Sequence, residues 1–380
     1  FSTQPNATSQ HPLPLTFSHR AQPQPQTPAM PRIQAFLHRT LPAIWQSRNW
    51  AACLLWPLSL LYGAVWRSKQ RRALRQPAAP LPIPVLVVGN VIAGGAGKTP
   101  TTIAVVQHFQ SLGVAVGVIS RGYGRRSDAP ECMAVAASSA AADVGDEPLL
   151  IHRRTAAPVA VCAKRVQAAH ALLQQHPQTQ LLICDDGLQH LALPRDGEIC
   201  VMDERGIGNG WLLPAGPLRE PWPRRTTLLL HTAPVASSAC APALPAGQAA
   251  YSATRQLASY AIQANGQSTP LGDWAASQQP VVALAGIALP ERFFTMLAAT
   301  GLHLHACHAL PDHASASAMQ ALASTLQTSG MPILCTEKDA VKLWPVFPHI
   351  WAVPLELAPE AAFFEALQQW WTKIQQQRRT

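Results

Sequence analysis

A strand that runs directly into a glycine-rich loop is the feature that most constrains this chain. Residues 85–88 are all apolar, and the loop over residues 93–97 leads into Lys98 and Thr99. Glycine lacks a Cβ, so such a loop lets the backbone approach a ligand closely. Bare amide N–H groups at the start of a helix suit a polyphosphate. The segment therefore predicts a nucleotide-binding P-loop in an α/β fold.

The loop is a variant of the full P-loop pattern. Ile92 stands where that pattern has glycine, and Ala93 stands where one subclass has a second lysine. A strand-to-helix turn without a ligand is the simpler alternative, but a Lys98–Thr99 pair before a plausible helix over residues 101–112 favours nucleotide. Lys98 would reach the β- and γ-phosphates, and the Thr99 hydroxyl would bind Mg²⁺. The predicted nucleotide-binding residues are Gly94, Gly95, Ala96, Gly97, Lys98, Thr99 and Pro100.

Short apolar runs recur along the chain between helix-like segments. Such alternation predicts a parallel sheet with helices on both faces. After a boundary rich in Ala, Pro and Ser, further runs predict a second, smaller α/β unit. The runs cover residues 85–88, 114–120, 159–162, 181–184, 199–203 and 227–231, then 281–285, 333–336 and 350–353. The predicted divisions are a disordered extension (1–40), a membrane-anchor helix (41–76), a P-loop domain (77–235) and the smaller domain (236–380).

The net charge limits the class of binding partner, and the cysteine pattern indicates the redox state of the compartment. The net charge of +9 indicates an anionic partner, although an arginine-rich genome would give the same balance. No nucleic-acid-binding motif is present, which leaves a phospholipid surface or a phosphorylated substrate. The eight cysteines are scattered singly, so the sequence supports neither a zinc site nor a disulfide framework. Cys184 and Cys335 lie in apolar runs and are expected to be buried thiols in a reducing compartment.

Residues 50–66 carry no charge and precede a dense basic run over residues 67–75. At 1.5 Å per residue the apolar segment reaches about 25 Å, the lower limit of a membrane span. Pro57 lies in its middle, and the tryptophans at positions 50 and 66 suit interfacial depth. We expect a membrane anchor, either a short span or a helix in the plane of the interface. A buried or partner-binding helix is the alternative.

Acidic residues follow the strand predicted over residues 181–184. Asp185 and Asp186 would lie at the carboxyl edge of the sheet, where a P-loop enzyme holds Mg²⁺. A helix N-cap with a solvated neighbour is the alternative, and the sequence leaves open which carboxylate would touch the metal.

Two further polar groups could carry chemistry. Asp146 and Glu147 form an acidic turn before Pro148, which is equally typical of an ordinary helix start. Asp312 and His313 could act as an acid–base pair, but a lone histidine is more often a surface or capping residue.

Several strings, in this order, resemble one family. They are PVLVVGNVIAGGAGKTP (84–100), SRGYG (120–124), VGDEPLL (144–150), DDGLQH (185–190), RGIGNGWLLPAGPLREP (205–221), GIALPERFF (286–294) and TEKDAVK (336–342). The chain resembles the tetraacyldisaccharide 4'-kinases over about residues 42–355. The resemblance implies a P-loop NTPase-like parallel sheet domain, a second, smaller α/β domain and an N-terminal membrane-associated helix.

The resemblance also implies a reaction. The family transfers the γ-phosphoryl group of ATP to the 4'-hydroxyl of lipid A disaccharide 1-phosphate, with Mg²⁺, and the product is lipid IVA. It works at the cytoplasmic face of the bacterial inner membrane. The implied partners are the lipid substrate and the membrane surface, with no nucleic acid and no obligate protein partner.

Matching positions supply the implied site. Asp146 would be the base for the sugar hydroxyl, assisted by His313, with Lys98 and Asp186 also catalytic and with Thr99 and Asp185 at the metal. The family usually has a second histidine where this chain has Ala314. The implied substrate-binding residues are Arg121, Tyr123, Glu147, Arg165, His190, Arg219 and Glu220.

Two other functions fit parts of the pattern. A membrane-associated P-loop ATPase or GTPase switch of the partitioning or metallochaperone type also carries GGxGKT, but Ala93 replaces the signature lysine of the partitioning type. A non-catalytic anchored protein that uses the basic run to bind lipid or nucleic acid would not need the set formed by Lys98, Thr99, Asp185 and Asp186. For a kinase, we expect the second domain to close over the nucleotide and exclude water.

Overall fold

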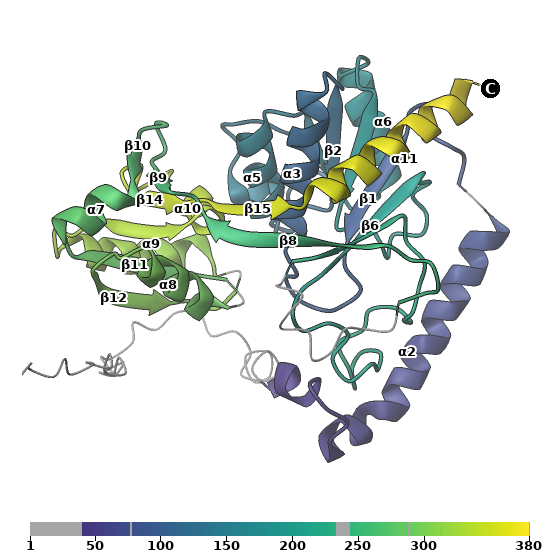
Figure 1. The fold of residues 1–380 in the computed structure, drawn as a ribbon, viewed down its shortest axis with the longest axis horizontal. Helices are drawn as coiled ribbons and strands as arrows, with labels where there is room; N and C mark the ends of the chain where they lie inside the picture. Colours follow the sequence, from purple (N-terminus) through teal and green to yellow (C-terminus); the bar gives the residue numbers. More distant parts are fainter. Residues whose placement is uncertain (1–39, 77, 233–243, 288, 313, 380) are drawn as a thin grey trace, which may run out of the picture.

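The computed structural model describes residues 40–379 apart from residues 77, 233–243, 288 and 313 (Figure 1). Two separate sheets organise this part of the chain. The extension predicted over residues 1–40 lies, except for Thr40, outside the described residues, and so does His313.

The larger sheet has the P-loop strand near its centre. It has nine strands within the described ranges, and the seven from β8 to β4 run parallel. Its central strands are buried on both faces, which is why they read as continuous apolar runs. In sheet order the strands are β15 (Leu355–Pro359), β8 (Ala250–Leu257), β7 (Leu228–His231), β6 (Gly197–Met202), β1 (Val85–Gly89), β5 (Leu181–Asp185), β2 (Val116–Ser120), β4 (Val159–Cys162) and β3 (Cys132–Val135).

Helices cover both faces of this sheet, as predicted. One face packs against α3 (Lys98–Ser111), α5 (Asp146–Thr155) and α11 (Ala361–Arg379), whose buried residues include Phe109, Leu149 and Trp370. The other face packs against α6 (Arg165–Gln175) and the irregular segment that follows β5. A short α4 (Ala141–Val144) precedes α5.

The smaller sheet forms the second α/β unit. Its core lies between two helix pairs, with Trp274 and Phe293 on one side and Met319 and Leu343 on the other. Its strands, in sheet order, are β10 (Ser268–Pro270), β9 (Tyr260–Ile262), β14 (Trp351–Val353), β13 (Ile333–Thr336), β11 (Val281–Ala285) and β12 (Leu304–Ala309). Its helices are α7 (Leu271–Ser277), α8 (Pro290–Ala299), α9 (Ala316–Gln327) and α10 (Glu337–Leu343).

The larger sheet does not end near residue 235, where the sequence predicted a boundary. β8 and β15 both follow that point in the chain, yet they pair with each other and extend the larger sheet. α11 then packs back onto the same sheet (Figure 1). The Trp370 ring lies against Gly197. Pairing between strands about a hundred residues apart leaves no local trace in the sequence, so the predicted boundary needs this correction.

Sequence spacing also missed a disulfide. Cys132 and Cys162 stand directly opposite each other in the antiparallel β3–β4 pair, with Cα atoms 4.4 Å apart, and they are bonded. Their separation of 30 residues along the chain hid this adjacency, so the spacing of the cysteines offered no support for this bond. Cys184 and Cys335 are buried free thiols, as expected.

The helix α2 (Trp50–Arg75) docks by a narrow polar and small-residue face. The Ser59 hydroxyl donates to Leu212 O (2.8 Å) and accepts from Ala215 N (3.0 Å). Gly63 leaves room for Leu212, since a Cβ there would lie 2.9 Å from Leu212 Cδ1. Along the remaining surface large apolar side chains are exposed: Trp50, Leu54, Trp56, Leu58, Leu60, Leu61, Val65 and Leu74. No helix in the described part of the chain combines the length and apolarity needed to cross a membrane.

Candidate active site

The P-loop lies where β1 ends and α3 begins. α3 starts at Lys98, three residues before the predicted start, and Gly97 precedes it with φ at +85°. A side chain at position 97 would be strained in this left-handed conformation, and its Cβ would lie 2.8 Å from Arg255 Nη2. The backbone turn therefore favours glycine at position 97, and Arg255 would have to shift to make room for a side chain.

Asp185 is the last residue of β5, the strand beside β1, and Asp186 follows it, so both lie at the predicted edge of the sheet. Asp185 is 1% exposed and accepts a hydrogen bond from the Thr102 hydroxyl (2.8 Å). Burial, with the nearby charges of Glu147 and Asp186, raises the pKa of Asp185 to about 7. A buried carboxyl of this kind needs a cation to hold it ionised.

Asp186 is the carboxylate that faces the positive charges. Lys98 Nζ lies 3.9 Å from Asp186 Oδ2, and Arg219 donates to Asp186 Oδ1 (3.0 Å). Burial alone would raise the pKa of Asp186, but Lys98 and Arg219 outweigh it and lower that pKa below its usual value. The Asp186 carboxylate thus brings the side chains of Lys98 and Arg219 close to each other beside the P-loop.

Asn90, which sequence reasoning missed, ties the P-loop to Arg219. Its amide donates to Gly94 O (3.2 Å), and its carbonyl oxygen accepts from Arg219 (3.1 Å). Asn90 is fully buried directly after β1, a position that could have drawn attention in the string VVGN.

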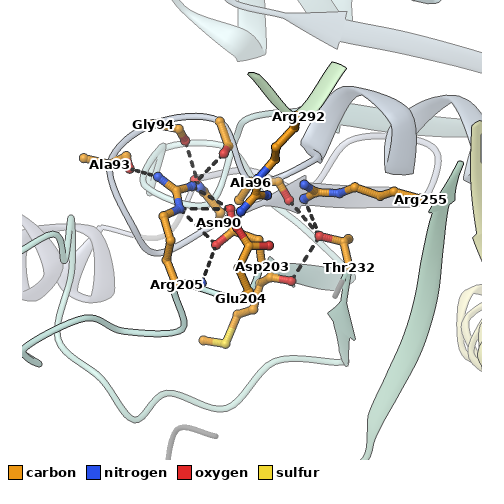
Figure 2. Close-up of polar contacts among 12 residues, drawn as sticks. Asn90, Ala93, Gly94, Ala96, Asp203, Glu204, Arg205, Thr232, Arg255 and Arg292 are labelled. Carbon is orange, nitrogen blue, oxygen red and sulfur yellow. Dashed lines mark hydrogen bonds and ion pairs between the residues drawn. The ribbon is translucent and has the colours of Figure 1, made fainter. Parts of the chain in front are cut away.

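Arg205, also missed, braces the P-loop from the loop that follows β6. Its guanidinium forms an ion pair with buried Asp203 (2.7 Å) and donates to Gly95 O (2.6 Å) and, at 3.4 Å, to Ala93 O. Figure 2 shows this side chain lying across the loop. Carbonyls held by Arg205 fix the conformation of the loop that otherwise departs from the full P-loop pattern. The signal was present, because Arg205 opens the string RGIGNG.

Two more arginines lie beside this loop (Figure 2). Arg255 on β8 donates to the Thr232 hydroxyl, which in turn donates to Ala96 O (3.4 Å). Arg292 on α8 pairs with Glu204 and so links the smaller sheet to the loop after β6. Elements from both sheets therefore border the P-loop.

Asp146 begins α5 and is 4% exposed. Its carboxylate is 3.1 Å from Lys342 Nζ and 3.9 Å from Lys338 Nζ, and both lysines lie on α10 of the smaller unit. Glu147 is 3.7 Å from Lys338, and its charge also acts on Asp185. The acidic turn is therefore part of the site and also receives two cations from the other sheet.

The predicted substrate-binding residues divide into two groups. Arg165 is buried with its Nε unpaired within the described structure, and it lies with Arg121 and Arg195 around His190. Burial and these three charges lower the pKa of His190 to about 4. Neutral His190 among arginines favours an anionic ligand such as a phosphate.

Glu220 and Tyr123, also predicted to bind substrate, differ in burial and in their contacts. Glu220 is buried and bound to Gln189 (2.8 Å) and Arg224 (2.9 Å), so both of its oxygens have protein partners. This arrangement makes Glu220 a support for the site. Tyr123 is largely exposed at the rim.

The residues present suit Mg²⁺ held mainly by phosphate oxygens. Asp185 Oδ2 is buried without a hydrogen-bond partner among the described residues. Thr99 lies one turn before Thr102 on α3, which places its side chain on the face that meets Asp185. No group of three or more His, Cys, Asp or Glu residues suited to a metal occurs in the described part of the chain. Mg²⁺ commonly takes one or two protein ligands and completes its shell with phosphates and water, so this set is sufficient.

Comparisons with known proteins decide the family. The model of the family described as "Tetraacyldisaccharide-1-P 4'-kinase" matches residues 51–372. The chain belongs to the tetraacyldisaccharide 4'-kinase family. A tetraacyldisaccharide 4'-kinase of Acidovorax sp. (strain JS42) is 50% identical over 89% of this chain and 96% of its own. One of Polaromonas naphthalenivorans (strain CJ2) is 49% identical over 85% and 92%.

A solved structure agrees in fold. The crystal structure of LpxK from Aquifex aeolicus in complex with ATP has a TM-score of 0.71, is 24% identical, and matches 84% of this chain and 99% of that one. The likeness confirms the α/β architecture that a tetraacyldisaccharide 4'-kinase was expected to have. The individual roles of the site residues stay predictions, and His313, the partner foreseen for Asp146, lies outside the described residues.

Proposed function

We propose that this chain transfers the γ-phosphoryl group of ATP to the 4'-hydroxyl of lipid A disaccharide 1-phosphate and so forms lipid IVA. Membership of the tetraacyldisaccharide 4'-kinase family supports the reaction. The observation that carries it is that Lys98, Asp185 and Asp186 meet at the P-loop while Glu147, beside Asp146, acts electrostatically on Asp185. A nucleotide site and an acidic acceptor site thus share one sheet edge.

The reaction joins two sites on this edge. Amides of the P-loop and Lys98 bind the β- and γ-phosphates, and Arg165 and Arg219 supply further charge for phosphate oxygens. The 4'-oxygen bonds to the γ-phosphorus as the bond from that phosphorus to the ADP oxygen breaks, and Asp146 receives the hydroxyl proton. Because bond breaking leads in such transition states, a well-placed acceptor matters more than a strong base.

Thr99 and Asp185 would hold Mg²⁺, which when bound neutralises charge on the β- and γ-phosphates. Thr102 orients Asp185 through its 2.8 Å hydrogen bond. Asp186 keeps Lys98 and Arg219 directed toward the same place. Asp185 would therefore bind the metal, whereas Asp186 would orient Lys98 and Arg219.

We further propose that α2 lies in the membrane interface at the cytoplasmic face of the inner membrane. Its exposed surface carries Trp50 (81% exposed) and several leucines, and its C-terminal part carries a run of arginines. Such a helix suits insertion to interfacial depth beside anionic headgroups. The Tyr62 hydroxyl donates to Arg219 O (2.8 Å), so the helix is joined to the site by a direct hydrogen bond.

The decisive test is transfer of ³²P from γ-labelled ATP to lipid A disaccharide 1-phosphate in detergent micelles with Mg²⁺. Labelled lipid that requires Lys98, with Lys98→Ala as the control, is the expected result. Release of free phosphate without labelled lipid would instead identify a nucleotide-hydrolysing switch.

Membrane association has a separate test. Sedimentation with vesicles that contain anionic phospholipid should capture the protein, and the variant Leu54→Ser/Leu58→Ser/Leu61→Ser should bind at least about tenfold less. These leucines are exposed, so the variant should fold normally. Equal capture of both proteins would contradict the interfacial role of α2.

A further inference from the structure

The string TEKDAVK (336–342) carries charges that the proposed reaction has not yet explained. It forms the end of β13 and most of α10, in the smaller unit. The Thr336 side chain caps the helix by accepting from Asp339 N (3.2 Å). Asp339 in turn accepts from Gly286 N (2.9 Å), so α10 is fixed to the loop after β11.

One face of α10 meets α5 of the larger sheet. Arg154 of α5 pairs with Glu337 at 2.8 Å, and both side chains are largely buried. On the same face, Lys338 and Lys342 lie one helical turn apart and both point at the start of α5. The interface therefore has a structural ion pair at one end and a lysine pair at the other.

The lysine pair surrounds the carboxylate proposed to accept the proton. Lys342 is 9% exposed, and its ammonium also donates to Ala314 O (3.4 Å). Lys338 contacts Glu147 (3.7 Å) and Asp312 (3.4 Å) in addition to Asp146. Burial would lower the pKa of Lys338, but Asp146, Glu147 and Asp312 raise it above its ordinary value, so this lysine stays charged.

A buried carboxylate without cations would be unstable as an anion and free to rotate. Here the Glu147 amide donates to Asp146 Oδ1 (3.0 Å), while the lysines meet Oδ2. One oxygen is thus held by the backbone of α5 and the other by side chains of the smaller unit. The acceptor geometry is complete only when the two sheets are in contact.

We infer that Lys342 and Lys338 are positioning residues for phosphoryl transfer, which hold the Asp146 carboxylate from the smaller unit. This inference rests on the proposed function, since it assigns the lysines a task only if Asp146 receives the hydroxyl proton. The contact makes transfer depend on the docked arrangement of α10 against α5, whereas the P-loop contacts of Lys98 are made within the larger sheet.

The experiment uses the full chain and measures kcat, the KM for ATP and labelled lipid. Lys342→Met should lower kcat by about 10- to 100-fold, a part of what a general base contributes, with the KM for ATP changed less than about twofold. Lys342→Arg keeps the charge and should restore most of kcat. The double variant with Asp146→Ala should be no slower than Asp146→Ala alone, because the lysine acts through that carboxylate.

A matched control separates positioning from simple docking. Arg154→Met/Glu337→Gln removes the structural pair of the same interface without touching Asp146, and kcat should stay within about threefold. An equal loss in this control, or additive losses of Lys342→Met and Asp146→Ala, would overturn the inference. Wild-type protein that makes no labelled lipid would instead reject the proposed function, so the two failures are distinct.

Discussion

The nucleotide side and the acceptor side of the site are built differently. On the nucleotide side, Lys98, Asp186 and Arg219 contact one another within the larger sheet and its loops. On the acceptor side, Asp146 belongs to the larger sheet but is held by Lys338 and Lys342 of the smaller unit. Nucleotide binding should therefore tolerate loss of the lysine contacts to Asp146, and transfer to the lipid should not.

The largest expected effect follows from loss of Lys98, on the nucleotide side. Lys98→Met removes the cation that faces the phosphates, so kcat/KM for labelled lipid should fall by about 1,000-fold or more. The rate of transfer at saturating ATP is the measurement, and circular dichroism checks the fold. A variant that retains a tenth of the wild-type rate would reject the role of Lys98.

The next effect should separate the two sides. Asp146→Asn keeps the shape of the side chain but accepts a proton poorly, so transfer should slow by about 100-fold. The Kd for ATP, measured by calorimetry, should stay within about threefold because the P-loop contacts are unchanged. If Asp146→Asn weakened ATP binding as much as it slowed transfer, Asp146 would also serve the nucleotide side, and the distinction between the two sides would be wrong.

A smaller effect should fall on the nucleotide side alone. Arg205→Met releases the carbonyls of Ala93 and Gly95, and the Kd for ATP should rise by about tenfold. Arg292→Met is the matched control, since Arg292 pairs with neighbouring Glu204, whereas Arg205 is the arginine that donates to the loop carbonyls. Equal effects of the two changes would show that Arg205 acts only through general charge.

The smallest effect concerns pH. The pKa of His190 is about 4 in the fold against an ordinary value of 6.5, so the unfolded chain binds more protons between these values. The free energy of unfolding should therefore fall as pH falls from about 6.5 toward 4. Urea denaturation across this range should give a shallower dependence for His190→Asn than for the wild type. Identical slopes would reject a depressed pKa at His190.

Much of the fold could be predicted because buried parallel strands are continuous apolar runs. All six strands predicted for the first unit and all three for the second are present. Six strands were missed, namely β3, β8, β9, β10, β12 and β15. β8 and β15 escaped prediction because their residues are partly exposed and their pairing joins distant segments. The β3–β4 disulfide was missed for the same reason.

Site residues could be predicted from the sequence where they directly follow or end an apolar strand. Gly97, Lys98 and the two aspartates at the end of β5 could be located from local patterns alone. Arg205 was overlooked although it opens the string RGIGNG. The contact of Lys342 could not be predicted, because Asp146 lies far away along the chain. The role of a charged residue in a loop or on a short helix depends on its contact partner, which is known only from the folded structure.

The β8–β15 pair has a mechanical consequence. The chain enters the smaller unit after β8 and leaves it before β15, and Ala258 N bonds to Pro354 O (2.9 Å) where the two passages meet. A single tether would allow rotation about any axis, whereas a hydrogen-bonded two-stranded ribbon flexes perpendicular to its plane and resists torsion. We therefore expect any motion between the two units to be mainly a swing perpendicular to this ribbon, which would return α10 to the same register on α5.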